Sequence, residues 1–329
     1  MKKKAAVIIN PIAGGGRALR GWKRLRASLP LAYDFDVFTS EYPGHARDLS
    51  FGLRAEEYAL ALAIGGDGTI HEVVNGLLDA GLNGKGVYEG PPFSLVPWGR
   101  GNDFARTLGI NRHDHSRWER ILAGEAVVPR PVDVGRVHVF GASRPQYFVN
   151  MCGAGFDADA CWFANKLPRH LGGAVPYVLG VFASFISMTH RPMIVRLSGV
   201  QDVAGIANKW DSIQVIGDSE IEVRDRLLLA SVGIGKYQGG GIMLLPHALA
   251  GDGYVDVLLA RRLKRLKLLR VLSGTFAGRH ITEPEVAYFR ARHVEITGPD
   301  NTRIQADGDH IGGKSATIDV LPALLPIIC

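Results

Sequence analysis

One stretch constrains the fold of this chain more than any other, because it combines an apolar run, a glycine turn and an amphipathic pattern in direct succession. Residues 61–64 (ALAI) are apolar, as in a buried strand, and they end at residues 65–69 (GGDGT). A helical pattern follows, with Ile70, Val73 and Leu77 on one face. A strand that turns through glycines into a helix directs backbone N–H groups and the helix dipole at one point, which favours a bound anion.

Asp67 lies inside this turn, where its carboxylate would repel a bare phosphate. A carboxylate beside a phosphate site usually needs a cation between the two negative charges. We therefore expect the turn to bind a nucleotide together with Mg²⁺. The alternative is an ordinary corner between a strand and a helix, in which the glycines only permit a tight bend.

A similar turn follows an apolar run at the start of the chain. Residues 5–9 are apolar, and they are followed by Asn10-Pro11, the glycines at 14–16 and a helical pattern. These glycines could surround a phosphate with backbone N–H groups, and Arg17 could offer its guanidinium fork. The alternative is a flexible loop between a strand and a helix.

A third turn follows the apolar run at 92–97. Its segment WGRGN contains Gly99 and Gly101 and opens a helical pattern in which Asp103 is a candidate N-terminal cap. Because the loops that follow parallel strands gather at the carboxyl edge of their sheet, we expect the three turns to meet there. Three such turns in one domain indicate a nucleotide site.

The order of elements changes after the first part of the chain. Residues 1–131 alternate between strands and helices, which predicts an α/β nucleotide-binding domain with a parallel sheet. Residues 132–317 contain mostly strand-like segments, with helical patterns near 157–190 and 262–279, which predicts a mostly antiparallel, sandwich-like β domain. We expect the nucleotide cleft between these domains, and we expect residues 318–329 to return to the first one.

Length, net charge, cysteine content and the length of apolar runs restrict what kind of protein this chain can be. A length of 329 residues predicts two domains, and a net charge of +6 favours anionic partners. Three cysteines without a CxxC motif indicate a reducing compartment and no zinc site. The apolar run at 5–9 is too short for a signal peptide, and the one at 174–188 is too short to cross a membrane. We expect a cytoplasmic protein without a transmembrane segment.

Two motif matches are rejected on their context. Residues 308–315 fit the G-x-x-x-x-G-K-S pattern, but the residues that follow alternate as in a strand, whereas a P-loop enters a helix. Residues 153–158 fit the G-x-G-x-x-A fingerprint, but residues 171–181 contain no acidic residue for a ribose. We interpret 153–158 as a turn of the second domain that packs near the cleft.

The segment GGDGTIHEVVNG at 65–76 resembles the nucleotide-binding signature of the diacylglycerol kinase catalytic domain family. PWGRGNDFAR at 97–106 is similar to a second family segment, QGGGIMLLPHALAGDGYVDV at 238–257 to its metal-binding segment, and ADGD at 306–309 to its D-G-E motif. GGDGT alone also occurs in nicotinamide-adenine dinucleotide kinases and phosphofructokinases. The combination, in order along the chain, is specific to this family of bacterial diacylglycerol and lipid kinases, which is related to sphingosine kinases.

The resemblance implies an ATP-dependent kinase that uses Mg²⁺ and transfers the γ-phosphate to a hydroxyl of diacylglycerol or a related lipid. The family commonly has Asn where this chain has His71, and Thr where it has Arg100. The turns and the resemblance together predict that the nucleotide is bound by Asn10, Arg17, Thr39, Gly65, Gly66, Asp67, Gly68, Thr69, Ile70, His71, Gly99, Arg100 and Asn102.

The resemblance also implies a catalytic and a metal site in the second domain. Asp309 stands where the family has a Glu as general base, and it is one methylene shorter. Asp307 would act as the base in its place, orient it or bind metal, although a polar hairpin turn is the alternative for this segment. Asp252, with the backbone carbonyls of Leu249 and Tyr254, matches a structural magnesium site.

We expect the partner to be a lipid substrate at a membrane surface, and we expect no nucleic acid; a homodimer stays open. The basic segment 261–270, with Leu263, Leu266 and Leu269 on one side, could lie on an anionic membrane on its inner face. The alternative is a core-facing helix with a solvated basic side.

Two other functions stay open at this point. One is a kinase of a soluble acceptor such as NAD. The other is a catalytically impaired, nucleotide-binding regulatory protein, which the unusual residues His71, Arg100 and Asp309 would explain.

Overall fold

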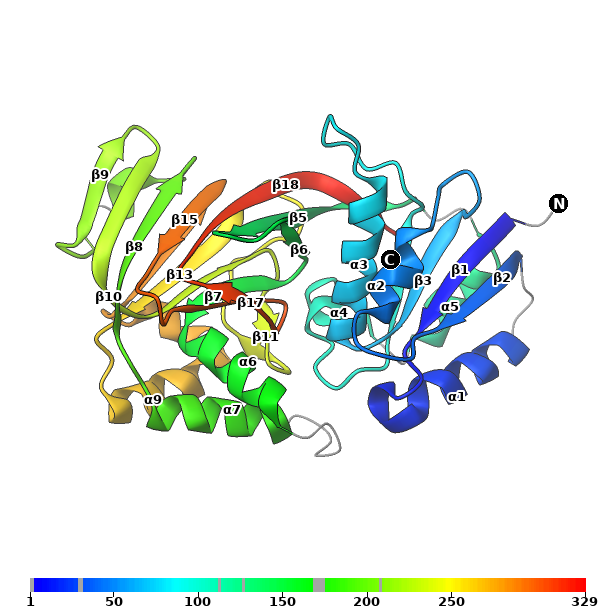
Figure 1. Ribbon diagram of the computed structural model, residues 1–329, viewed down its shortest axis with the longest axis horizontal. Helices are drawn as coiled ribbons and strands as arrows, with labels where there is room; N and C mark the ends of the chain where they lie inside the picture. Colours follow the sequence, from blue (N-terminus) through cyan, green and yellow to red (C-terminus); the bar gives the residue numbers. More distant parts are fainter. Residues whose placement is uncertain (1–2, 29–31, 112–113, 126–127, 168–174, 207–208) are drawn as a thin grey trace. The chain divides into compact units, whose positions relative to one another are not determined.

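Figure 1 shows the protein as a computed structural model that describes residues 3–28, 32–111, 114–125, 128–167, 175–206 and 209–329. The chain divides into two compact units. Unit 1 consists of Met1–Val132 and Ala323–Cys329, and unit 2 consists of Asp133–Pro322. The order of predicted elements put the change of architecture after residue 131 and the return of the chain at 318–329.

Unit 1 is built on a parallel sheet with the strand order β2-β1-β3-β4-β18. All six residues of β3 and the last five of β1 are buried, as expected for a parallel sheet covered on both faces. The predicted α/β architecture of this part of the chain is therefore confirmed. The strands are β1 (Lys3–Ile9), β2 (Tyr33–Thr39), β3 (Leu60–Gly65), β4 (Phe93–Pro97) and the end of β18 (Ser315–Ile327).

The helices of unit 1 connect these strands. They are α1 (Ala13–Ser28), α2 (His45–Phe51), α3 (Asp67–Gly81), α4 (Asp103–Thr107) and α5 (His115–Leu122). Ile70, Val73 and Leu77 of α3 are buried, as the helical pattern predicts. Helix α3 packs so closely on α2 that a Cβ atom added to Gly76 would lie 2.1 Å from Ser50 Oγ.

The order in which strands are added to the sheet changes side at β1, although all these strands remain parallel. Strand β2 lies on one side of β1, whereas β3 and β4 lie on the other. In open α/β sheets, ligands bind outside the carboxyl ends of the strands at such a switch point. The loops that leave β1 and β3 border this point, and both carry a glycine turn.

The last residues of the chain complete the sheet of unit 1. Ile327 pairs with Phe93 of β4 in parallel register, and Ile328 N donates to Phe93 O at 2.8 Å. Ser94 Oγ donates to Ile328 O at 2.8 Å. The polar groups of this C-terminal segment are thus bound within unit 1.

Unit 2 consists mainly of antiparallel strands, so the predicted β-rich second part is confirmed. They are β5 (Arg130–Val139), β6 (Gln146–Phe148), β7 (Met151–Gly155), β8 (Arg191–Ser198), β9 (Ile213–Gly217), β10 (Glu220–Gly233), β11 (Tyr237–Gln238), β12 (Ile242–Met243), β13 (Val255–Arg261), β14 (Val286–Ala291), β15 (His293–Thr297), β16 (Arg303–Ala306), β17 (Asp309–Gly313) and most of β18.

The long strand β10 connects two layers of unit 2. Its first half, up to Leu227, pairs with β8 and β9, whereas its second half pairs with β7 and β13. The register with β13 shifts between Leu227 and Leu229, where the strand passes from one set of neighbours to the other. Gly155 of β7 lies beside this point, and a Cβ atom there would come within 2.5 Å of Leu228 O.

Helices α6 (Phe156–Lys166), α7 (Val175–Ile186) and α9 (Arg265–Thr275) lie together on one side of the strands of unit 2 (Figure 1). They enclose a second core that includes Phe156, Leu228, Leu258 and Leu268. The short α8 (Val203–Ile206) and the 3-10 helix η2 (Arg279–Thr282) complete the unit. Helices α6, α7 and α9 lie in the two predicted helical regions, whereas α8 was not predicted. Residues 168–174 lie outside the described part of the chain.

The basic segment forms a helix only from Arg265 on, so Leu263 does not share a helix face with Leu266 and Leu269. Leu263 is buried before the helix begins, whereas Leu266 and Leu269 are 84% and 52% exposed. Arg262 has a φ of 46°, which breaks the helical path, so α9 starts only at Arg265. The buried face is formed by Leu268, Val271 and Thr275.

The two rejected motifs are absent as functional motifs. Residues 308–315 run from the turn before β17, through β17, to the first residue of β18, so a strand and not a helix follows Lys314. Residues 153–158 form the corner between the end of β7 and the start of α6. A Cβ atom at Gly153 would come within 2.1 Å of Asp157 Oδ2, so this glycine makes room for a buried carboxylate.

No helix in the described ranges is long and apolar enough to cross a membrane.

Candidate active site

The turns after β1 and β3 are tied together across the switch point of unit 1. Asn10 Nδ2 donates to Thr69 Oγ1 at 3.2 Å, and Asn10 N donates to Ile64 O at 3.1 Å. Thr69 is 5% exposed and lies in the first turn of α3. A hydrogen bond between these side chains therefore fixes the start of the glycine loop relative to the start of the helix.

The third turn meets the other two in backbone contact. A Cβ atom added to Gly99 would lie 2.3 Å from Gly66 Cα, and one added to Gly14 would lie 2.5 Å from Trp98 O. Real Cβ atoms do not approach other atoms so closely, so these positions require glycine. The structure thus brings the three predicted turns together at the carboxyl edge of the sheet, where their backbone N–H groups can bind an anion.

The loop after β1 is ordered by its own side chains. Gly14, Gly15 and Gly16 have φ values of 60°, 70° and 79°, so they form a left-handed turn before the right-handed part of α1. Arg17 Nε donates to Gly14 O at 2.7 Å, and Arg20 Nη2 donates to Gly15 O at 3.3 Å. Arg17 is exposed at this turn, as a phosphate contact would require.

Asp67 is engaged by the turn after β4. Its Oδ1 accepts a hydrogen bond from Phe104 N at 3.2 Å, at the start of α4. The predicted cap of that helix is therefore wrong: Asn102 occupies the cap position, and Asp67 supplies the acceptor. Burial, together with the nearby Asp103 carboxylate, raises the pKa of Asp67 to about 6.

The other predicted nucleotide residues fall into two groups. Ile70 and His71 are buried in α3, and the His71 ring lies 3.4 Å from Asn75 Nδ2. In contrast, three residues are exposed: Thr39 at the end of β2, Gly68 in the first turn of α3 and Arg100 in the turn after β4. The two positions that depart from the family pattern thus differ in kind, because His71 is an interior residue and Arg100 is a surface residue.

Asn102 offers an acceptor that the described residues leave without a donor. It has a φ of 51°, and its Nδ2 donates to Gly99 O at 3.1 Å, which closes the turn. Its Oδ1 is enclosed and has no hydrogen-bond partner among the described side chains and backbone groups. A buried oxygen of this kind is suited to a ligand hydroxyl or amino group.

In unit 2, Asp307 and Gly308 form a two-residue turn between β16 and β17. Their φ values of 47° and 94° are left-handed, as a type I′ hairpin requires. The Asp307 carboxylate accepts hydrogen bonds from three backbone groups, Val149 N at 2.9 Å, Asn150 N at 3.0 Å and Met151 N at 2.9 Å. Asp307 therefore anchors the hairpin to the start of β7. Asp309, the first residue of β17, is exposed.

A network of hydrogen bonds, part of it buried, also fixes the turn at Asp307 and Gly308. Gly308 N donates to Gln305 Oε1 at 2.9 Å, and Asn165 Nδ2 of α6 donates to Gly308 O at 3.2 Å. Gln305 Nε2 in turn donates to Asp157 Oδ2 at 3.3 Å, which also accepts from Ser231 Oγ at 3.0 Å. Burial raises the pKa of Asp157 to about 7. The backbone beside Asp309 is thus fixed at both the N–H and the C=O of Gly308.

The sequence analysis missed Gln305 and Asp157. Asp157 lies within the G-x-G-x-x-A match, so the pattern did mark a constrained corner, although not a dinucleotide site. Gln305 gives no sequence signal, because its role depends on three other segments of the chain. Both side chains are buried.

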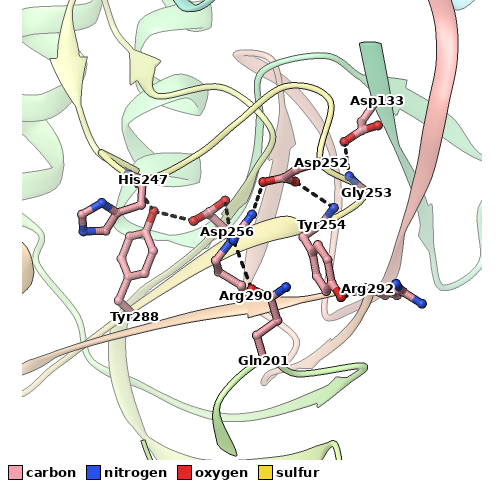
Figure 2. A network of polar contacts seen from close by, with 10 residues as sticks. All are labelled: Asp133, Gln201, His247, Asp252, Gly253, Tyr254, Asp256, Tyr288, Arg290 and Arg292. Atoms are coloured by element: carbon pink, nitrogen blue, oxygen red, sulfur yellow. Dashed lines mark hydrogen bonds and ion pairs between the residues drawn. The ribbon is translucent and has the colours of Figure 1, made fainter. Parts of the chain in front are cut away.

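The predicted magnesium segment is engaged by an arginine. Figure 2 shows Asp252 beside Arg290, with which its Oδ2 forms an ion pair, while its Oδ1 accepts from Tyr254 N at 3.1 Å. Leu249 O accepts from Gly251 N at 2.8 Å. As arranged, these groups do not fit a cation, because Mg²⁺ would have to displace the Arg290 guanidinium from Asp252.

The surroundings of Arg290 explain why it holds this place. Its Nη1 donates to Gln201 Oε1 at 3.1 Å, and its Nε lies 3.8 Å from Asp256 Oδ2. Asp256 is 1% exposed and accepts from Tyr288 Oη at 2.8 Å (Figure 2). Burial raises the pKa of Asp256 to about 6. Within the described residues there is no cluster of three His, Cys, Asp or Glu side chains that could hold a metal.

The chain is similar to known proteins along most of its length. The diacylglycerol kinase catalytic domain family matches residues 4–137, and the YegS C-terminal NAD kinase beta sandwich-like domain matches residues 150–329. The chain is 27% identical to a diacylglycerol kinase of Bacillus subtilis over 94% of this chain and 91% of that one. It is 25% identical to a diacylglycerol kinase of Mycobacterium tuberculosis over 99% and 94%. A crystal structure of a diacylglycerol kinase from Bacillus anthracis has the same fold, with a TM-score of 0.67 at 20% identity over 99% and 96% of the two chains.

The same substitution at two neighbouring aspartates should affect stability differently. Asp307→Asn places an NH₂ group against backbone N–H groups, so we expect a loss of about 1–3 kcal/mol in the free energy of unfolding. Asp309→Asn changes an exposed side chain and should stay within about 0.5 kcal/mol of the wild type. Urea unfolding followed by circular dichroism measures both values, and equal values for the two variants would contradict the anchoring role.

Magnesium should not stabilise the wild-type protein through Asp252, because Arg290 already neutralises that carboxylate. We expect the melting temperature without nucleotide to be the same in EDTA and in Mg²⁺. Arg290→Met removes the charge but keeps a long side chain, and it should make the melting temperature depend on Mg²⁺. A magnesium-dependent shift in the wild type that Asp252→Asn abolishes would show instead that Leu249, Asp252 and Tyr254 bind the metal.

Proposed function

Because the chain belongs to the diacylglycerol kinase catalytic domain family, we propose that it transfers the γ-phosphate of ATP, bound as its magnesium complex, to a hydroxyl of diacylglycerol or a related lipid. The observation that carries this proposal is the meeting of three glycine turns at the carboxyl edge of the unit 1 sheet. Phosphoryl transfer depends mainly on positioning and on stabilisation of charge, and such turns supply preorganised N–H donors.

We assign the nucleotide to the switch point of unit 1. Gly66 and Gly99 hold two turns in contact, and Gly68 and Arg100 are exposed beside them. The Arg100 guanidinium can make a bidentate contact with a phosphate, which the family's Thr cannot make. The enclosed Oδ1 of Asn102 would accept a hydrogen bond from the nucleotide.

We assign the general base to Asp309. A base has to reach the proton of the acceptor hydroxyl, and Asp309 is exposed while its backbone is fixed by the anchored turn. Asp307 is unsuited to that task, because its carboxylate already accepts three backbone hydrogen bonds. We therefore give Asp307 a positioning role.

Labelled ATP and a panel of lipids in mixed micelles test this proposal directly. We expect a phosphorylated lipid, and we expect Asp309→Asn to lower kcat by about 100-fold or more, since general base catalysis contributes on that scale. Asp309→Glu should retain activity because it restores the family's residue. Asp300→Asn, on an exposed loop, serves as the matched control.

Three results would overturn the proposal. Absence of product across diacylglycerol, monoacylglycerol, phosphatidylglycerol, sphingosine and ceramide would argue against a lipid kinase. Turnover of a soluble acceptor such as NAD without lipid would show a kinase of another class. Binding of ATP without turnover, unchanged by Asp309→Asn, would indicate a regulatory protein.

The pKa of Asp67 predicts a pH dependence of nucleotide binding. With a pKa of about 6 the carboxyl is mostly protonated below that pH, and only the ionised form attracts the nucleotide's cation. Affinity for ATP with Mg²⁺ should therefore rise between about pH 5 and pH 7, by up to about tenfold per pH unit below the pKa. Isothermal titration calorimetry measures the change.

Asp67→Asn is the control for this experiment. The amide keeps an oxygen that can accept from Phe104 N but does not titrate, so the variant reports only the ionisation of the nucleotide itself. A steeper pH dependence in the wild type than in the variant is the expected result. Parallel curves would remove Asp67 from the binding of the cation.

A further inference from the structure

Helix α7 carries an apolar stripe on its outer side. Val178 and Phe182 are each 60% exposed, Ile186 is 58% exposed, and Val175 and Leu179 are 47% and 43% exposed. These positions recur every three to four residues, so they form one face of the helix. Helix α7 contains no charged residue at all. The outer face of an ordinary surface helix is polar. An exposed apolar stripe of this kind indicates a surface that binds an apolar partner.

The exposure of the stripe does not come from loose packing of the helix. The opposite side of α7 is seated on unit 2, where a Cβ atom added to Gly180 would come within 2.3 Å of Ala160 O of α6. Val181 and Phe185 pack against the second core. Helix α7 is thus apolar on both sides, with only one side covered within unit 2.

The stripe continues onto α9. Arg265, the first residue of α9, donates from Nη2 to Ile186 O at 2.8 Å, at the last residue of α7. Leu266 is 84% exposed and Leu269 is 52% exposed. The two helices therefore meet at one point, and each presents large exposed apolar side chains.

Basic residues accompany this apolar surface. The segment 261–275 contains six Lys and Arg residues and no acidic residue. Lys267 is paired with Glu283 at 3.2 Å and with Glu285. Lys264, Arg265 and Arg270 are exposed. The surface thus combines exposed apolar groups with an excess of positive charge.

This combination fits an anionic lipid surface better than a second copy of the chain. Apolar side chains enter the headgroup region of a bilayer, and each nearby Lys or Arg adds about 1 kcal/mol of attraction to anionic lipid. Two copies that met through this surface would instead bring like charges together. We propose that the outer stripe of α7 and the exposed side of α9 form a docking surface for an anionic membrane.

Vesicle flotation of the full chain, without ATP, tests the docking surface independently of catalysis. We expect binding to phosphatidylglycerol vesicles that weakens with added salt, and little binding to phosphatidylcholine vesicles. Phe182→Ser/Ile186→Ser and Lys264→Glu/Arg270→Glu should each lower binding by about tenfold or more. The matched control Val215→Ser/Ile216→Ser changes two exposed apolar residues on β9 and should leave binding unchanged.

The variants are first checked for native circular dichroism, and Val178→Ser/Leu266→Ser replaces any pair that fails to fold. Equal binding of the wild type to both kinds of vesicle would overturn the inference. The inference would also fail if both the apolar variant and the basic variant bound vesicles as strongly as the wild type does. Dimerisation without vesicles that Phe182→Ser/Ile186→Ser abolishes would overturn it too, because the surface would then join two copies. Because flotation needs no substrate, its outcome is separate from that of the kinase assay.

Discussion

The contact between Gly66 and Gly99 is the constraint on which the carboxyl edge of the unit 1 sheet depends. Two turns from neighbouring strands meet without side chains between them, so their backbones lie closer than any other residues would allow. This contact brings Asp67 within reach of Phe104 N at the start of α4. A carboxylate held in so confined a place loses water, and the rise of its pKa follows from the same geometry.

Unit 2 uses its carboxylates in two different ways around one hairpin. Asp307 accepts three backbone hydrogen bonds and fixes the turn, whereas Asp309, two residues further on, is exposed. Gln305 also stabilises the turn, because it accepts a hydrogen bond from Gly308 N and donates one to the buried Asp157. A rigid support under an exposed carboxylate is what a positioned base requires.

Features that depend on local pattern could be predicted from the sequence. The strand at 61–64 and the helix after it are examples, because the apolar run and the helical spacing of apolar residues can be seen in consecutive residues of the sequence. The partners of Asp67 and Asp307 could not be predicted, since they lie 37 and more than 150 residues away. The placement of Leu263 on the basic helix was wrong, because α9 starts only at Arg265, after the left-handed φ of Arg262.

The strand that completes unit 1 has a consequence for the order in which the protein can form. During synthesis the chain emerges from its N-terminus, so residues 1–132 are available long before 323–329. Until then Phe93 and Ser94 lack their partners at Ile327 and Ile328, and β4 is an unprotected edge. Unit 2 has to be made before unit 1 can be finished. The last step in building the sheet of unit 1 is therefore a long-range closure, which is slow and exposes the edge to wrong pairing in the meantime.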